Sequence, residues 1–185
     1  VGSVREALSA AGEIGGKFLT LYAFSSENWR RPKEETSALM DLLVQSIYNE
    51  LDDLNSNGVK LATIGDVEVL PKSCQIALKK AIESTKSNKK ITLILALSYS
   101  SRREISLAVQ KMAQKVMNRQ LECTAINEDL ISSYLSTADY PDPELLIRTS
   151  GENRVSNFLM WQLAYTELYF TKILWPDFKK KNFYK

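Results

Sequence analysis

Residues 91–99 read ITLILALSY, a nearly continuous apolar run of strand length, and the polar loop of residues 100–103 follows directly. The next residues, from about 104 to 118, have the apolar spacing of a helix. An apolar run without polar alternation is typical of a strand that is buried on both faces of a parallel sheet. This stretch therefore predicts one strand–loop–helix unit of an α/β fold.

The same kind of unit recurs on both sides of this stretch. Apolar runs of strand length lie at residues 18–24, 59–64 and 145–148, and helical spacing is found at residues 4–14, 34–54, 71–84 and 127–135. Strands that alternate with helices are typical of a parallel sheet. We therefore predict a single parallel-stranded sheet flanked by helices, in one domain that extends over residues 1–185.

Three of the four predicted strands end in a loop that carries serine and arginine. These side chains are Ser25, Ser26, Arg30 and Arg31, then Ser100, Ser101, Arg102 and Arg103, and finally Arg148, Ser150, Arg154 and Ser156. Because the carboxyl ends of parallel strands share one edge of a sheet, where ligands collect, we expect these loops to converge. Guanidinium and hydroxyl groups together suit an anion with several oxygen atoms, such as a phosphate or diphosphate.

The last loop belongs to the stretch LLIRTSGENRVSNFLMWQLAYTELYFTKILWPDF, residues 145–178. We interpret it as a strand that ends on Arg148, a polar loop, and a helix that begins near Ser156. Arg148 alone could equally be a salt-bridge residue. Its combination with Arg154 and Ser156 in one loop favours the binding of a phosphate or diphosphate.

The composition excludes several function classes. The chain has no histidine and two cysteines, which excludes Ser-His-Asp and Cys-His nucleophile chemistry and disfavours a zinc site. Any metal would need oxygen ligands, which points to Mg²⁺. A net charge of +2 does not indicate a nucleic-acid-binding protein. Two distant cysteines without metal spacing fit reduced thiols, so we expect a cytoplasmic location.

Two long blocks resemble the cis-prenyltransferases, and specifically the bacterial isoprenyl transferases or undecaprenyl diphosphate synthases. The blocks are LTLYAFSSENWRRPKEE, residues 19–35, and IRTSGENRVSNFLMWQLAYTELYF with the later WPDF, residues 147–178. Between them, LALSYSSRREI is similar to the family's middle motif. Because each block is far longer than a short motif, the resemblance is favoured over a generic phosphate-binding α/β domain.

The resemblance implies a Mg²⁺-dependent transferase that joins an allylic diphosphate to isopentenyl diphosphate and makes each new double bond cis. The implied product is a long-chain polyprenyl diphosphate such as undecaprenyl diphosphate, the cell-wall lipid carrier precursor, with farnesyl diphosphate as the primer. A homodimer, no nucleic-acid partner and a transient membrane association for product release are also implied. The growing chain would occupy a hydrophobic tunnel, which Leu39, Leu42, Leu43 and Ile47 either line or support as core residues.

The resemblance also assigns roles to single residues. The diphosphate of isopentenyl diphosphate would be bound by Arg148, Arg154, Val155 and Ser156. The allylic substrate and the reacting centre would be contacted by Ser25, Ser26, Glu27, Trp29 and Arg31, although Trp29 could equally be a packing residue. Glu167 would help to hold Mg²⁺, from its own chain or from the partner subunit's side.

Asn28 matches the family position that is often assigned as the proton acceptor. A neutral amide has almost no basicity near pH 7. We therefore interpret Asn28 as an orienting hydrogen-bond partner and expect a carboxylate or the diphosphate to take the proton.

The chain departs from the family at both ends. The family's first motif, an Asp-Gly-Asn-x-Arg loop that supplies a Mg²⁺ ligand, is not found, and only KKKNFYK follows WPDF. We therefore expect residues 1–185 to lack the first motif and the C-terminal tail, and to turn over little or not at all by themselves. A non-catalytic partner subunit of a heteromeric prenyltransferase is the alternative, which the intact SSENW block disfavours.

Overall fold

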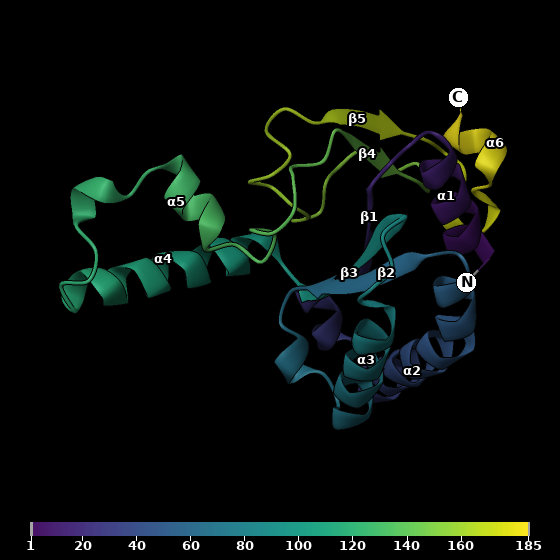
Figure 1. Cartoon of the computed structure of the whole chain (residues 1–185), viewed down its shortest axis with the longest axis horizontal. Coiled ribbons are helices and arrows are strands. Elements are labelled where there is room, and N and C mark those ends of the chain that lie inside the picture. Colours follow the sequence, from purple (N-terminus) through teal and green to yellow (C-terminus); the bar gives the residue numbers. More distant parts are fainter. Residues whose placement is uncertain (1, 185) are drawn as a thin grey trace.

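The computed structural model describes residues 2–184, in which helices and strands alternate from the amino-terminal end as far as α4 (Figure 1). The helices are α1 (Gly2–Glu13), α2 (Lys33–Ser56), α3 (Lys72–Thr85), α4 (Ser101–Met117), α5 (Glu128–Ser133) and α6 (Lys180–Phe183). The strands are β1 (Phe18–Ser25), β2 (Val59–Ile64), β3 (Ile91–Tyr99), β4 (Leu145–Arg148) and β5 (Glu167–Phe170). Elements α1 to α5 and β1 to β4 confirm the predicted helices and strands to within a few residues.

Strand β3 lies at the centre of a three-stranded parallel sheet in the order β1-β3-β2. Leu93 of β3 is paired with Leu19 of β1 and with Leu61 of β2. Helices α2 and α3 pack side by side below this sheet (Figure 1). One face of β3 packs on α2 and α3, and the other packs on the segment that contains Phe158 and Leu159, so most of its residues are buried. Burial on both faces explains why its sequence shows no polar alternation.

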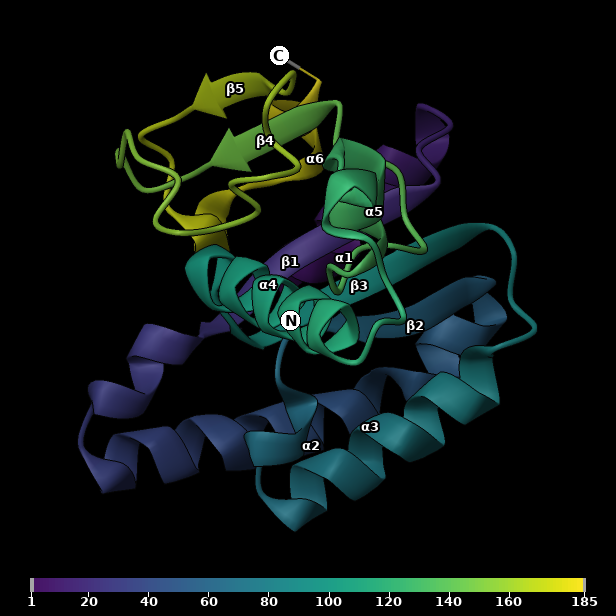
Figure 2. The same cartoon turned by 90° about the vertical axis from the view of Figure 1, so that its left-hand side faces the viewer.

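Strands β4 and β5 form a second parallel sheet, in which Leu145 is paired with Glu167 and Arg148 with Phe170. Figure 2 shows this pair above β1 and the rest of the larger sheet. The expected parallel α/β architecture with flanking helices is confirmed. Its strands are hydrogen-bonded in two groups, however, where the sequence predicted a single sheet, and β5 was not predicted.

The helix predicted after Ser156 is wrong, because residues 157–165 form a series of turns. Ser156, Asn157 and Leu159 have φ angles of 50°, 61° and 45°, in the left-handed region that interrupts a right-handed helix. One helix-like hydrogen bond remains, from Leu163 N to Leu159 O at 2.9 Å. Glu167 consequently begins a strand and does not flank a helix.

The hydrophobic core is divided into clusters that hold the layers together. The largest lies between α1, α2, α3 and the three-stranded sheet. A smaller cluster joins α4 to the segment around α5, where Trp161 packs and its Nε1 donates to Ser132 Oγ at 2.9 Å. The helices within residues 2–184 include none with the length and apolar character that crossing a membrane requires.

Candidate functional site

The loops that follow β1, β3 and β4 meet at the side chain of Asn157. Its Nδ2 donates to Glu27 Oε1 at 2.8 Å and to Ser100 Oγ at 2.7 Å. Its Oδ1 accepts a hydrogen bond from the backbone N–H of Arg102 at 2.9 Å. One amide therefore joins three loops at the carboxyl edge of the sheet, as the serine and arginine pattern led us to expect.

The importance of Asn157 was missed in the sequence. Its contacts to Glu27 and Ser100 span more than fifty residues, so no local spacing indicates them. A weak signal was present nevertheless, because asparagine is one of the few residues that adopts a left-handed backbone readily. Its φ of 61° turns the side chain toward the β1 and β3 loops.

Asn28 lies in the 3₁₀ helix η1 (Ser26–Arg30), directly after β1. Its Oδ1 accepts a hydrogen bond from the backbone N–H of Ser25 at 2.8 Å, and its backbone oxygen accepts one from Arg31 N at 3.1 Å. The amide oxygen of Asn28 is thus already engaged in holding the turn. This leaves the NH₂ group as the part of the side chain that is suited to orient a ligand.

Trp29 connects the same turn to the end of β3. Its Nε1 donates to Ser98 Oγ at 2.9 Å, and its ring meets Phe24 edge-to-face with centroids 4.9 Å apart. Ser98 is buried and has a φ of 47°, which places its hydroxyl under the indole. Trp29 is 37% exposed, so it both packs in the site and presents a surface to it.

Two titratable groups have shifted pKa values at this edge. Partial burial opposes ionisation of Glu27, but hydrogen bonds from Asn157, its own backbone, Ser25 and Ser26 outweigh it and lower the pKa of Glu27. Burial raises the pKa of Tyr22 to about 12, while the positive charge of Arg148 acts in the opposite direction. Near neutral pH the site therefore contains a carboxylate and a protonated phenol.

Tyr22 holds the β4 loop against the larger sheet. Its hydroxyl donates to the backbone oxygens of Tyr99 at 3.3 Å and Ser156 at 3.5 Å. Its ring stacks on Phe158 with centroids 4.5 Å apart and an interplanar angle of 13°. The backbone of Ser156 is therefore fixed from below, beside the end of β3.

The predicted arginines differ in their partners. Arg31 forms an ion pair with Glu35, and Arg154 forms one with Glu152 in its own loop. Within residues 2–184 the guanidinium of Arg148 forms no ion pair, although it is partly buried at the end of β4. An arginine without a carboxylate partner is suited to bind an anionic ligand.

The loop that carries Arg154, Val155 and Ser156 is anchored at its start. Ser150 N donates to Ile173 O at 2.8 Å and Gly151 N donates to Thr171 O at 2.9 Å. Gly151 has a φ of 72°, which a glycine adopts without strain. Val155 is half-buried, and its backbone oxygen accepts from Phe158 N at 3.1 Å, so the loop closes in a turn.

Glu167 lies apart from the other predicted site residues. It is paired with Leu145 at the start of β4, whereas Arg148 ends that strand, so they are about 10 Å apart along the strand direction. Residues 2–184 contain no group of three or more His, Cys, Asp or Glu side chains that could hold a metal ion. Glu167 is the right ligand type for Mg²⁺, but it would be a single ligand beside the oxygens of a bound phosphate.

A cavity of about 570 Å³ lies between α1, α2 and the larger sheet. Its apolar lining includes Val4, Leu8, Leu21, Ala23, Leu43, Ile47, Leu54, Val59, Leu61, Ile91, Leu93 and Leu95. Leu43 and Ile47 are thus where a tunnel lining was expected, whereas Leu39 packs against the core outside this lining. Leu42 is 57% exposed, so its predicted inward position is wrong.

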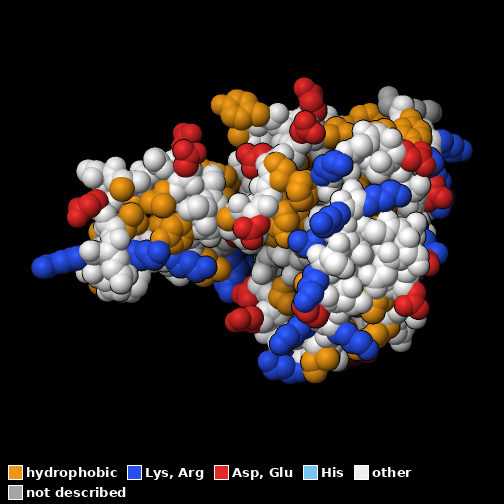
Figure 3. All heavy atoms as spheres, in the orientation of Figure 1, with side chains coloured by type: hydrophobic (Ala, Val, Ile, Leu, Met, Phe, Trp, Pro, Cys, Tyr) orange, Lys and Arg blue, Asp and Glu red, His pale blue; other side chains and the backbone are white. Residues whose placement is uncertain are grey.

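The surface carries two contrasting features. Figure 3 shows lysine and arginine side chains in a band that runs from the region of β4 and β5 down toward the lower helices. Hydrophobic side chains gather over the projecting α4 and α5. Another apolar group lies in residues 165–174, where Tyr165, Leu168, Tyr169 and Leu174 are exposed.

The family model of undecaprenyl diphosphate synthase matches residues 1–185. The isoprenyl transferase of Porphyromonas gingivalis is 53% identical over 178 residues, which cover 96% of this chain and 70% of that protein. The isoprenyl transferase of Clostridium tetani is 48% identical over 185 residues, which cover 100% of this chain and 72% of that protein. A ditrans,polycis-undecaprenyl-diphosphate synthase from Pasteurella multocida is named as specific for (2E,6E)-farnesyl diphosphate. It is 46% identical over 183 residues, which cover 99% of this chain and 76% of that protein.

Two solved structures are similar to the whole arrangement. Lavandulyl diphosphate synthase from Lavandula x intermedia, in complex with dimethylallyl diphosphate, superposes with a TM-score of 0.94 and 35% identity. That match covers 98% of this chain and 78% of the other. A protein from Campylobacter jejuni, described as a probable undecaprenyl diphosphate synthase, has a TM-score of 0.86 and 33% identity. That match covers 99% of this chain and 84% of the other.

Proposed function

The chain belongs to the undecaprenyl diphosphate synthase family of prenyl-transferring enzymes, and we propose that its site joins isopentenyl diphosphate to an allylic diphosphate. Repeated additions make a long-chain polyprenyl diphosphate such as undecaprenyl diphosphate. Farnesyl diphosphate is the proposed primer, in line with the specificity named for the Pasteurella multocida relative. The alternative of a non-catalytic partner subunit is not favoured, because the SSENW block of residues 25–29 is intact and tied into the site.

The proposal rests mainly on one observation, which is that the polar loops and the apolar cavity meet on strand β1. Ala23 of β1 lines the cavity, and Ser25, two residues later, begins the polar turn. A substrate whose diphosphate is held by the loops would therefore direct its prenyl tail into the cavity. This combination suits an amphipathic prenyl diphosphate better than a free phosphate.

The proposed reaction needs charge stabilisation and orientation more than covalent catalysis. The allylic C–O bond breaks as a new C–C bond forms to isopentenyl diphosphate, and negative charge builds on the departing diphosphate. Arg31, with Ser25, Ser26 and Trp29, would hold the allylic substrate, and Arg148, Arg154 and Ser156 would hold the other diphosphate. Fixed guanidinium groups stabilise the developing charge without reorganisation during the reaction.

The new bond leaves a cationic carbon that must lose a proton. Asn28 Oδ1 already accepts from Ser25 N, which supports an orienting role for Asn28. Hydrogen bonds lower the pKa of Glu27, so its carboxylate is ionised near neutral pH and can accept a proton, as can the substrate diphosphate. We assign the proton to one of these two oxygen groups.

Mg²⁺ is the proposed cofactor, and it would neutralise diphosphate charge when bound. Glu167 is the one carboxylate that the family resemblance assigns to Mg²⁺. It is paired with Leu145 at the start of β4, whereas Arg148 ends that strand, and this separation favours a role for Glu167 at the site of a partner subunit. The exposed Tyr165, Leu168, Tyr169 and Leu174 surround it in the chain. We propose that this segment forms the contact of a homodimer in the cytoplasm, with transient membrane association when the apolar product leaves.

The test is transfer of labelled isopentenyl diphosphate to farnesyl diphosphate by the natural protein that contains these residues. Arg148→Ala is expected to reduce kcat/KM at least a hundredfold. Arg148→Lys should keep kcat/KM between the values of Arg148→Ala and the unchanged protein, because lysine retains the charge but lacks the planar guanidinium that binds two oxygens at once. Lys79→Ala, on the exposed face of α3, is the control and should resemble the unchanged protein. Absence of any isopentenyl transfer by the unchanged protein would refute the proposed function.

A further inference from the structure

Asn157 is attached to the first turn of α4 by two hydrogen bonds. Its backbone oxygen accepts from the backbone N–H of Ser101 at 2.9 Å, and its side-chain Oδ1 accepts from that of Arg102 at 2.9 Å. Because a backbone N–H can only donate, the contact to Arg102 fixes which end of the amide is the oxygen. The NH₂ group of Asn157 therefore points the other way, toward Glu27 and Ser100.

The carboxylate of Glu27 receives one side-chain hydrogen bond on each of its oxygens. Asn157 Nδ2 donates to Oε1 at 2.8 Å, and Ser26 Oγ donates to Oε2 at 3.3 Å. A carboxylate can accept about four hydrogen bonds, so both oxygens can still bind a further donor. Glu27 is exposed at the carboxyl edge of the sheet, which makes this carboxylate accessible to a bound substrate.

The contact between Asn157 and Glu27 joins the two parts of the proposed substrate site. Glu27 lies in η1, among the residues proposed for the allylic substrate. Asn157 directly follows Ser156, which is proposed for the other diphosphate and whose backbone oxygen accepts from the Tyr22 hydroxyl at 3.5 Å. The Glu27 carboxylate is thus one side chain away from the loop that would hold isopentenyl diphosphate.

The proposed reaction needs a base at this boundary. When the allylic C–O bond breaks and the new C–C bond forms, the diphosphate leaves with the bonding electrons and a cationic carbon remains on the isopentenyl unit. The electrons of the C–H bond at the neighbouring C2 carbon then form the new double bond, and the proton is lost. Such a proton is strongly acidic, so the position of the base matters more than its strength.

We propose that Asn157 is a positioning residue of this reaction, which holds the Glu27 carboxylate toward the isopentenyl unit so that Glu27 takes the C2 proton. This inference rests on the proposed function and decides between its two candidate bases. The departing diphosphate is the less suitable base, because the guanidinium groups that stabilise its charge also lower its affinity for a proton. Within residues 2–184 Glu27 forms no ion pair, so its carboxylate has no such competing cation.

The experiment measures single turnovers of the natural protein with farnesyl diphosphate and with isopentenyl diphosphate that is either unlabelled or deuterated at C2. Glu27→Gln should slow transfer by about a hundredfold or more and raise the isotope effect, because removal of the C2 hydrogen becomes rate-limiting. Glu27→Gly should be slow as well, and added formate should restore part of its rate by replacing the lost carboxylate.

Variants of Asn157 test the positioning role. Asn157→Gly removes the amide but keeps the backbone, because glycine adopts a φ of 61° without strain. Asn157→Asp keeps the oxygen that accepts from Arg102 N and replaces the donor to Glu27 by a negative oxygen. Both variants should slow transfer by about tenfold or more and raise the isotope effect, with Asn157→Asp the slower. A purely structural role would lower the rate without raising the isotope effect.

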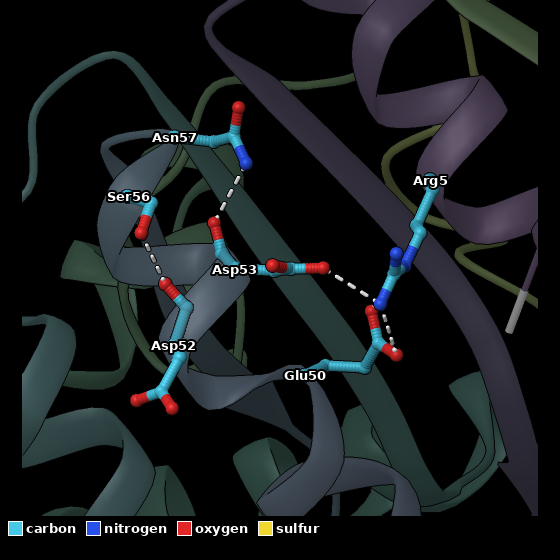
Figure 4. Close-up of polar contacts among 6 residues, drawn as sticks. All are labelled: Arg5, Glu50, Asp52, Asp53, Ser56 and Asn57. Carbon is cyan, nitrogen blue, oxygen red and sulfur yellow. Dashed lines mark hydrogen bonds and ion pairs between the residues drawn. The ribbon is translucent and has the colours of Figure 1, made fainter.

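Asn57→Gly is the matched control, because it also removes an asparagine hydrogen bond. Asn57 Nδ2 donates to the backbone oxygen of Asp53 at 2.8 Å, the same distance as in the contact of Asn157 to Glu27 (Figure 4). Asn57 lies between α2 and β2, however, and so at the opposite edge of the sheet. This variant should leave the isotope effect unchanged.

The outcomes separate this proposal from the proposed function. If the unchanged protein transfers isopentenyl groups but Glu27→Gln keeps its rate or shows no larger isotope effect, the diphosphate is the base, and this proposal is overturned while the proposed function stands. A larger isotope effect in Glu27→Gln but not in the Asn157 variants would overturn the positioning role of Asn157. If the unchanged protein makes no product, the proposed function fails and this proposal fails with it.

Discussion

At the scale of single residues, the amide groups of Asn28 and Asn157 organise the candidate site more than its charges do. Asn157 joins three loops through both ends of its side chain, and Asn28 holds the turn after β1 through its oxygen. Neutral amides can place neighbouring charged groups without adding a charge that would repel a diphosphate. This is a physical reason for asparagine, rather than aspartate, at both positions.

Asn28 offers a test that separates its structural role from its role toward the ligand. Asn28→Asp keeps the oxygen that accepts from Ser25 N, so the free energy of unfolding should change by less than about 0.5 kcal/mol. It removes the NH₂ donor and adds negative charge, so kcat/KM for isopentenyl transfer should fall at least tenfold. Asn28→Ala should lower the free energy of unfolding by about 1 kcal/mol, the net value of a typical hydrogen bond. Full activity in Asn28→Asp would contradict the requirement for a neutral amide.

At the scale of elements, the carboxylate of Glu104 joins β3, α4 and two loops. Glu104 is 8% exposed and accepts from Tyr99 Oη, from Gln162 Nε2 at 3.0 Å, and from Ser136 N at 3.1 Å and Oγ at 2.7 Å. Burial and the neighbouring Glu104 carboxylate raise the pKa of Tyr99 far above its usual range, so the phenol remains a donor. These contacts hold the base of α4 beside the loops of the site.

Glu104→Gln should therefore be strongly destabilising, although it conserves size. The new NH₂ group would face the donors of Tyr99, Gln162 or Ser136, leaving buried groups unpaired. We expect the free energy of unfolding in urea to fall by about 2–4 kcal/mol. Glu122→Gln, at an exposed position after α4, should change it by less than about 0.5 kcal/mol. Equal stability of the two variants would show that the Glu104 network is not needed.

The elements also show where sequence reasoning succeeds and where it fails. Residues 91–99 are a recognisable strand because burial on both sides leaves an apolar run, and the same holds for residues 59–64. The predicted helix after Ser156 fails because the contacts of Asn157 to distant loops favour left-handed backbone angles there. Strand β4 could be predicted from its apolar run, whereas β5, of the same length, begins with an exposed Glu167, and its pairing with β4 is a tertiary contact.

At the scale of the whole molecule, the serine and arginine loops could be placed on one edge from topology alone, but the position of Glu167 could not. Its partner across the sheet is Leu145, at the end of β4 opposite to Arg148. That register depends on which strands pair, and local sequence does not encode it. Four apolar side chains near it in the chain, Tyr165, Leu168, Tyr169 and Leu174, are exposed, which is a feature of interfaces between subunits.

If Glu167 serves the site of a partner subunit, two inactive variants should complement each other. Arg148→Ala and Glu167→Ala homodimers each lack one group at both sites. A mixed dimer has one site with both lesions and one site with neither, because a two-fold axis exchanges the contributions of the subunits. With random pairing half of the dimers are mixed, so co-refolded subunits should recover about a quarter of the unchanged protein's transfer rate.

The control is to refold the two variants separately and combine them immediately before the assay, which should give no recovery while subunits have not exchanged. Differently tagged subunits show by co-purification that mixed dimers have formed. Mixed dimers without activity would place Glu167 in the site of its own chain, against the register of β4 and β5. A single-subunit mass in sedimentation would instead remove the dimer from the proposal. Recovery requires both an interface and a shared site, so one measurement tests the two together.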